Sequence, residues 1–82
     1  MSEGTEPAVP LGTLQPGDRA KVVALDLAGG QRGRILEMGV TVGVTVEVVR
    51  FAPMGDPMEL KVRGAHVSLR KADAAGLRVR RL

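Results

Sequence analysis

Apolar and polar residues alternate along several short stretches of the chain. This two-residue period predicts strands that bury one face and expose the other. Glycine, proline and other turn-forming residues separate the stretches at intervals of roughly eight to twelve positions, a spacing typical of small all-β domains. The predicted strands cover residues 19–27, 44–52, 58–63, 65–69 and 77–80. The side chains predicted to point inward from the last two strands are Ala65, Val67, Leu69, Leu77 and Val79.

Helical spacing is confined to short segments. Leu11 and Leu14 are three positions apart, which predicts one helical turn with both leucines toward the core. Residues 31–38 form the one longer predicted helix, and Gly39 follows where a left-handed C-terminal residue belongs. Gly33 weakens this helix by about 1 kcal/mol relative to alanine. The predicted apolar stripe of the helix comprises Ile35, Leu36 and Met38.

The order of these segments predicts a mainly β fold, a small barrel of about five strands with a short helix after the first long strand. Closure of the barrel would remove the exposed strand edges. Residues 71–76 predict a helical turn before the last strand. Residues 1–10 are polar and show no period, so we expect a disordered tail. Residues 11–82 are then the single domain that a chain of 82 residues has room for.

Composition bears on the compartment and on possible partners. The chain has no cysteine, and its first ten residues contain Glu3 and Glu6 but no apolar run. We therefore expect a cytoplasmic protein without a signal peptide. The formal net charge is +3, with basic residues concentrated at Arg32 and Arg34 and near the C-terminus. Such a surface suits nucleic acid, anionic lipid or an acidic protein, or is simply a mildly basic exterior.

The residues that catalysis and metal binding require are scarce. The chain has no cysteine, tyrosine or tryptophan, and its carboxylates are scattered singly. His66 is the only histidine, so it is a weak candidate metal ligand without an evident partner. The glycine-rich stretch 29–33 precedes the predicted helix but lacks the Lys-Ser/Thr pair of a phosphate-binding loop. We therefore predict no enzymatic activity, no cofactor and no metal site.

The connection between the second and third strands is chemically distinctive. It reads Ala-Pro-Met-Gly-Asp-Pro over residues 52–57, which predicts an irregular hairpin loop rather than a minimal turn. Met54 lies between a proline and a glycine, where an apolar side chain has no core to enter. Small barrels differ in function mainly through their loops and faces, so this loop is a candidate functional site.

Four separated motifs in a fixed order resemble the FeoA family. They are Leu11–Gly17 (LGTLQPG), Arg34–Gly43 (RILEMGVTVG), Ala52–Met58 (APMGDPM), and Val62–Gly64 (VRG) with Leu69–Ala74 (LRKADA). The resemblance covers residues 11–81. The order and spacing of the motifs make it specific, whereas any single motif would be weak. Gly33 departs from the family pattern, which more often has a charged or helix-forming residue there.

The resemblance implies an SH3-like barrel with a helical insertion after the first strand. It also implies a non-enzymatic accessory protein of bacterial ferrous iron uptake. Its partner would be the membrane transporter FeoB, which carries a cytoplasmic GTPase domain, so that the chain lies at the membrane only through that partner. The family has no catalytic motif at residue level, so no catalytic residue is carried over to this chain.

We predict that the docking surface combines the end of the helix with the loop between the second and third strands. Its residues are Arg34, Met38, Gly39, Val40, Pro53, Met54, Gly55, Asp56 and Pro57. Methionine adapts well to irregular apolar contacts, which favours this choice. The alternative interpretation is that Met38 is a core residue and that Met54 only covers the end of the barrel.

Two other functions stay open at this point. A nucleic-acid-binding barrel fits the positive charge, but Phe51 is the only aromatic residue and bases usually stack on several. A weak divalent-metal-sensing module would use His66 with a carboxylate. Self-association is also possible if the barrel stays open at one edge.

Overall fold

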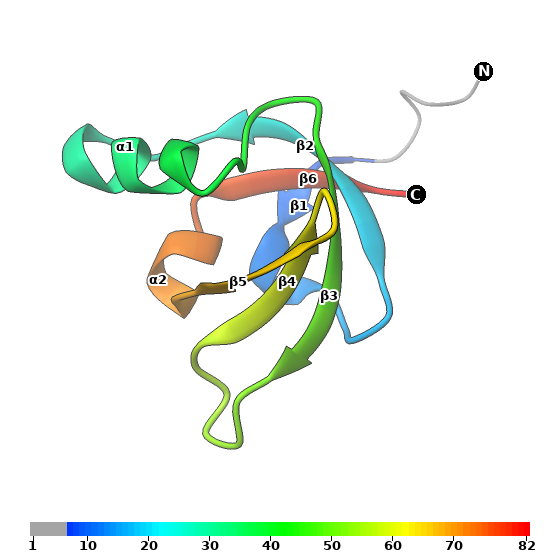
Figure 1. Cartoon of the computed structure of the whole chain (residues 1–82). Helices are drawn as coiled ribbons and strands as arrows, with labels where there is room; N and C mark the ends of the chain where they lie inside the picture. Colours follow the sequence, from blue (N-terminus) through cyan, green and yellow to red (C-terminus); the bar gives the residue numbers. More distant parts are fainter. Residues whose placement is uncertain (1–6) are drawn as a thin grey trace.

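The computed structural model describes residues 7–82, which form one antiparallel sheet with three short helical segments (Figure 1). The strand order is β1-β6-β2-β3-β4-β5. The strands are β1 (Val9–Pro10), β2 (Arg19–Leu25), β3 (Thr45–Phe51), β4 (Met58–Val62), β5 (Ala65–Leu69) and β6 (Leu77–Arg81). The helices are the 3₁₀ turn η1 (Leu11–Thr13), α1 (Gly29–Glu37) and α2 (Lys71–Ala74).

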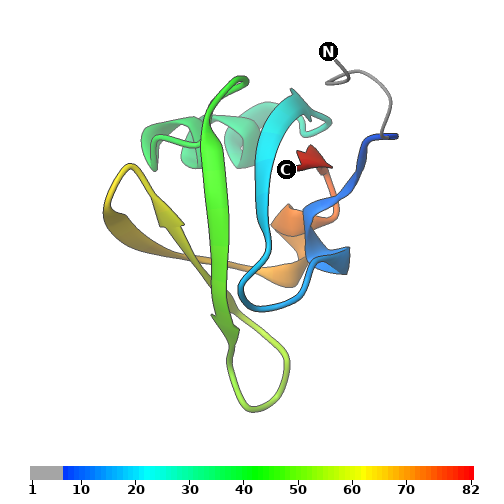
Figure 2. The same cartoon turned by 90° about the vertical axis from the view of Figure 1, so that its right-hand side faces the viewer.

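The sheet is strongly curved, as the second view shows (Figure 2). The strand pairing shifts register between Val22 and Ala24 in β2 and between Val48 and Arg50 in β3. Such irregularities bend and twist a strand, so they let a short sheet curl around its own core. The predicted mainly β fold, a small SH3-like barrel, is confirmed. Within the described chain, β1 and β5 each pair with one strand only.

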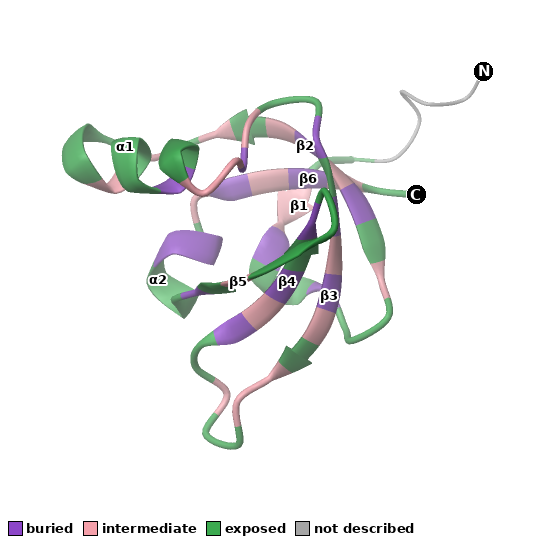
Figure 3. Ribbon diagram, viewed as in Figure 1, coloured by how far each residue is buried: buried purple, intermediate pink, exposed green. Residues whose placement is uncertain are grey.

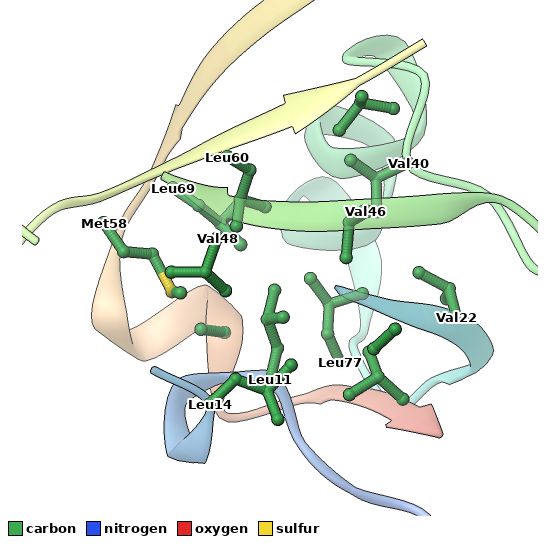
Figure 4. Close-up of a cluster of buried hydrophobic side chains, with 14 of the residues drawn as sticks. Leu11, Leu14, Val22, Val40, Val46, Val48, Met58, Leu60, Leu69 and Leu77 are labelled. Atoms are coloured by element: carbon green, nitrogen blue, oxygen red, sulfur yellow. The ribbon is translucent and has the colours of Figure 1, made fainter. Parts of the chain in front are cut away.

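The inner face of the curved sheet encloses a core of aliphatic side chains (Figure 3). β3, β4 and β6 alternate buried with more exposed positions along their length. Leu11 and Leu14 come from the η1 region and, as predicted, lie fully inside. A close-up shows that the helices and most strands contribute to one cluster (Figure 4). The labelled members are Leu11, Leu14, Val22, Val40, Val46, Val48, Met58, Leu60, Leu69 and Leu77.

Several boundaries differ from the sequence predictions. Residues 9 and 10, which we placed in the disordered tail, form β1 and pair with β6. Residues 1–6 of that tail lie outside the described residues. The longer helix begins at Gly29 and ends at Glu37 rather than covering 31–38. β2 ends at Leu25, after which the amide of Asp26 donates to the Gly76 carbonyl at 2.6 Å.

Two side chains predicted to point inward are exposed. Leu36 is 38% exposed, because α1 buries only Ile35 fully and the chain after the helix buries Val40 instead. Ala65 is exposed because it begins β5, which is an edge strand. Leu69, Leu77 and Val79 are buried as predicted. None of the described helices has the length and apolar content needed to cross a membrane.

Candidate docking surface

The end of α1 is held by a set of backbone hydrogen bonds. Gly39 has φ of 88°, and its amide donates to the Leu36 carbonyl at 3.0 Å. The amide of Val40 donates to the Ile35 carbonyl at 3.4 Å. This is the pattern of a Schellman motif, in which the residue after the glycine packs against the last turn of the helix. Val40 and Ile35 are both fully buried, so the motif anchors α1 to the core.

α1 is also tied to α2 through a buried carboxylate. The side chain of Asp73, 3% exposed as a residue, accepts a hydrogen bond from Gln31 Nε2 at 2.6 Å. Arg34 Nη2 lies 3.4 Å from the same Asp73 oxygen, Oδ1, and most of the Arg34 side chain stays in solvent. The charge of Asp73 is therefore both hydrogen-bonded and paired, as a buried carboxylate requires.

A hollow of about 280 Å³ lies between α1 and the junction of β5 with α2. We call it the α1–β5 groove, and it is lined by Arg34, Met38, Ser68, Arg70 and Asp73. Met38 is half-buried against the core, whereas Arg34, Ser68 and Arg70 are exposed. The groove thus combines one apolar wall with two guanidinium groups, a hydroxyl and the buried carboxylate of Asp73.

The loop between β3 and β4 is closed at its base and open at its tip. The amide of Ala52 donates to the Pro57 carbonyl at 2.9 Å, and the amide of Gly55 donates to the Ala52 carbonyl at 2.7 Å. Met54 at the tip is 92% exposed. Because the backbone bonds hold the loop, the methionine side chain is displayed by a structured turn.

Asp56 joins this loop to α2. Its Oδ1 accepts a hydrogen bond from the amide of Lys71 at 2.9 Å. Lys71 is the first residue of α2, so Asp56 satisfies an amide that has no partner within the helix. Capping groups normally come from the residue just before a helix. Here the group comes from 15 positions earlier, which no local sequence pattern indicates.

The two halves of the predicted surface lie on the same side of the molecule. α1 is at the top of this side and the β3–β4 loop at the bottom, with α2 and β5 between them (Figure 1). A second hollow of about 420 Å³ lies at the base of the loop, where Phe51, Pro53 and Pro57 contribute to its lining. Ser68 lines both hollows, so the surface is continuous from helix to loop.

The outer face of the sheet next to this surface holds a charged cluster. Glu59 Oε1 accepts from Arg50 Nε at 2.8 Å, and Glu59 Oε2 lies 2.7 Å from His66 Nδ1. The hydrogen bond with His66, and to a lesser extent the one with Arg50, holds the pKa of Glu59 below its ordinary value. Within residues 7–82, no group of three or more potential metal ligands includes His66.

The arginines near the C-terminus do not form a free basic patch. Arg78 and Arg80 are half-buried on β6, which lies between β1 and β2. Arg81 lies 3.5 Å from an Asp18 carboxylate oxygen, and Arg80 also has a partner. The positive charge that suggested nucleic acid is thus partly neutralised within the fold.

The FeoA domain model matches residues 9–81 of the chain. The chain belongs to the FeoA family. A curated relative from Porphyromonas gingivalis, an Fe(2+) transport protein A/Fe(2+) transporter FeoB fusion protein, is 44% identical over 69 residues. That match covers 84% of this chain but only 8% of the fusion protein.

Solved FeoA structures have the same fold. The FeoA protein of Chlorobium tepidum is 35% identical, with a TM-score of 0.84 over 90% of this chain and 70% of that chain. The crystal structure of an iron uptake regulatory protein (FeoA) is 32% identical, with a TM-score of 0.82 over 92% of this chain and 97% of that chain.

The structure shows that one of the predicted docking residues is not at the surface. Val40 is fully buried, so its side chain is a core anchor and is unavailable to a partner. Arg34 and Met54 are exposed, while Met38 is half-buried and reaches the groove. Sequence reasoning missed Ser68 and Arg70, because neither stands out locally; only the packing of α1 beside β5 and α2 brings them into the surface.

Proposed function

We propose that this FeoA domain is a non-enzymatic accessory protein of ferrous iron uptake that docks on an FeoB-type transporter in the cytoplasm and modulates it. The observation that carries this proposal is the fusion protein, in which a region 44% identical to this chain is joined to an FeoB transporter. The chain spans 8% of that relative, which leaves the transport machinery to the rest of the fusion.

Covalent fusion and non-covalent docking serve the same physical end. A linker holds two modules at a high effective concentration, so a weak contact between them is still formed. Where the two modules are not fused, they need an interface that binds without a linker. The chain has few reactive groups, which supports an action through binding rather than catalysis.

The docking surface that we propose runs from the end of α1 to the β3–β4 loop. Met54 is the most exposed large apolar side chain of the described residues, and Arg34 lines the groove. Methionine and arginine are also enriched at protein interfaces. The proposed residues are Arg34, Met38, Gly39, Pro53, Met54, Gly55, Asp56 and Pro57.

A pull-down with the cytoplasmic GTPase domain of an FeoB transporter tests this proposal. We expect Met54→Asp and Arg34→Glu each to weaken binding at least tenfold, or about 1.4 kcal/mol. Met54→Leu and Arg19→Glu are matched controls, because the first keeps an apolar side chain and the second changes an exposed charge on β2.

Circular dichroism and thermal unfolding must show that each variant folds. Arg34→Gln serves as a second variant if Arg34→Glu disturbs the pairing with Asp73. Undiminished binding by folded Met54→Asp and Arg34→Gln would show that the docking surface lies elsewhere. Absence of binding by the unmodified chain would refute the docking itself.

A further inference from the structure

β5 presents one unpaired edge. It pairs with β4 alone, through a two-residue turn in which Arg63 and Gly64 have φ of 52° and 84°. Two positive φ values make a type I′ turn, so Val62 and Ala65 are its hydrogen-bonded closing pair. Hydrogen-bonded and non-hydrogen-bonded pairs alternate along an antiparallel ladder. The backbone groups of His66 and Ser68 therefore face away from β4.

This edge lacks most of the usual protective features. Its sequence, Ala-His-Val-Ser-Leu, has no proline, lysine or acidic residue, and its pairing with β4 shows no bulge. Proteins normally block exposed edges with such features or with a covering segment. The opposite edge strand, β1, has two residues and contains Pro10. In the described chain, no backbone hydrogen bond outside the sheet reaches His66 or Ser68.

The free edge borders the α1–β5 groove, whose lining has two guanidinium groups and one carboxylate, that of Asp73. Ser68 supplies both an outward backbone amide and part of the groove wall. Arg70 is exposed, and its guanidinium has no ion-pair partner within residues 7–82. Arg34 reaches Asp73 at 3.4 Å but keeps a 57% exposed side chain. An entering carboxylate would thus meet two accessible guanidinium groups.

We propose that β5 accepts an extended, acidic segment of a partner protein as an additional strand. Backbone hydrogen bonds to His66 and Ser68 would give the segment its register. A carboxylate of the segment would bind between Arg34 and Arg70, and an apolar side chain would contact Met38. This inference adds a binding mode to the proposed function. It depends on the proposed function only for the statement that the acidic segment belongs to the transporter.

Charge selects this occupant over a second copy of the chain. β5 contains no acidic residue, so two copies paired through β5 would bring no carboxylate of that strand to Arg34 and Arg70. The formal net charge of +3 also makes two copies repel each other. An acidic strand from a partner would instead be attracted to Arg34 and Arg70, and its backbone would pair with the free amides of His66 and Ser68.

A synthetic peptide with the sequence TVEVEVT, acetylated and amidated at its ends, is a suitable probe. We expect its titration into the ¹⁵N-labelled full chain to shift the amide resonances of His66 and Ser68 and to slow their hydrogen exchange. The peptide TVKVKVT, with lysine for glutamate, should bind at least tenfold more weakly. Equal binding of the two peptides, or shifts confined to another face, would overturn the proposal.

Two pairs of variants test the parts of the site separately. Ser68→Pro removes the outward amide and suits an edge strand, where such a proline is tolerated, whereas Ser68→Ala keeps the amide. Arg70→Gln removes one guanidinium, and Arg19→Gln removes another exposed charge, on β2. We expect the first member of each pair to bind TVEVEVT at least tenfold more weakly, and the control to bind unchanged.

Further measurements separate this inference from the proposed function. If TVEVEVT binds as expected but the transporter's GTPase domain does not, the strand site stands and the assignment to the transporter fails. If the GTPase domain binds Ser68→Pro and Arg70→Gln as well as the unmodified chain, the strand site plays no part in docking. A concentration-dependent dimer abolished by Ser68→Pro would identify a second copy as the occupant and overturn the proposal. His66→Pro is the replacement variant if Ser68→Pro does not fold.

Discussion

Single carboxylates hold together elements that are distant in the sequence. The Asp73 carboxylate accepts hydrogen bonds from Gln31 and Arg34 of α1. The Asp56 carboxylate accepts a hydrogen bond from the first backbone amide of α2. Buried side-chain polar atoms of the described residues all have hydrogen-bond partners. Asp73 is buried, so without its partners it would keep the full cost of desolvation, which makes its contacts specific as well as stabilising.

Glu59 leads to a prediction about pH at the residue scale. Its pKa is lowered from the ordinary value of 4.5 by hydrogen bonds with His66 and Arg50. A depressed pKa in the folded state means that Glu59 contributes stability above pH 4.5, which is lost as the pH falls through the lower folded value. In urea unfolding at about pH 7 and about pH 3, the unmodified chain should therefore lose more stability than Glu59→Gln.

Glu47→Gln is the control for this measurement. Glu47 lies half-buried on β3, and the described residues supply no hydrogen bond to its carboxylate. Its variant should follow the unmodified chain over the same pH range. An identical pH dependence for Glu59→Gln and the unmodified chain would contradict the role of the cluster. The effect should be small, because the cluster is solvent-exposed.

At the scale of elements, α1 shows how one residue type has opposite effects within a few positions. Gly33 lies inside the helix, where glycine lacks the backbone restriction and side-chain contacts that favour helix formation. Gly39 ends the helix with φ of 88°, a conformation that other residues rarely adopt. The first glycine weakens the helix, while the second is needed to turn Val40 into the core.

Alanine substitutions at these two glycines should therefore change stability in opposite directions. An added Cβ at Gly33 meets no atom within 4 Å, so Gly33→Ala should raise the free energy of unfolding by about 1 kcal/mol. Gly39→Ala should lower it by about 1–2 kcal/mol, because the left-handed conformation is strained for alanine. Urea denaturation measures both values, and a change of the same sign in both would contradict this account.

At the scale of the whole molecule, stability comes from one aliphatic core inside a curved sheet. Leu60 on β4 is fully buried within it, whereas Val42 lies before β3 and is 59% exposed. A chain of 82 residues buries a modest share of its surface, so each core side chain is a large part of its total stability. The exposed rim is then free to vary with function.

Leu60→Ala should lower the free energy of unfolding by about 2–5 kcal/mol, since it removes buried methyl groups and leaves a cavity. Val42→Ala should change it by less than about 0.5 kcal/mol, as is usual for exposed positions. Chemical denaturation followed by circular dichroism gives both values. Comparable losses for the two variants would show that the core is not organised as described.

The sequence alone determined most of the elements and most of the side chains that face the core. The two-residue period placed β3 to β6 within a residue or two, and it pointed Leu77 and Val79 inward. Gly39 correctly marked the end of α1, and the motif order indicated the FeoA family. These features depend on neighbours only a few positions away, so a linear pattern contains them.

The tertiary structure decided which residues meet. Asp56 is hydrogen-bonded to the amide of Lys71 in α2, 15 positions away in the sequence. Asp73 is hydrogen-bonded to Arg34 and Gln31, which are 39 and 42 positions away. The burial of Val40, the exposure of Leu36 and the place of Ser68 beside α1 likewise follow from how α1 lies against the sheet. Contacts at such separations are set by the packing of the whole chain around its core, which no local pattern of polar and apolar residues encodes.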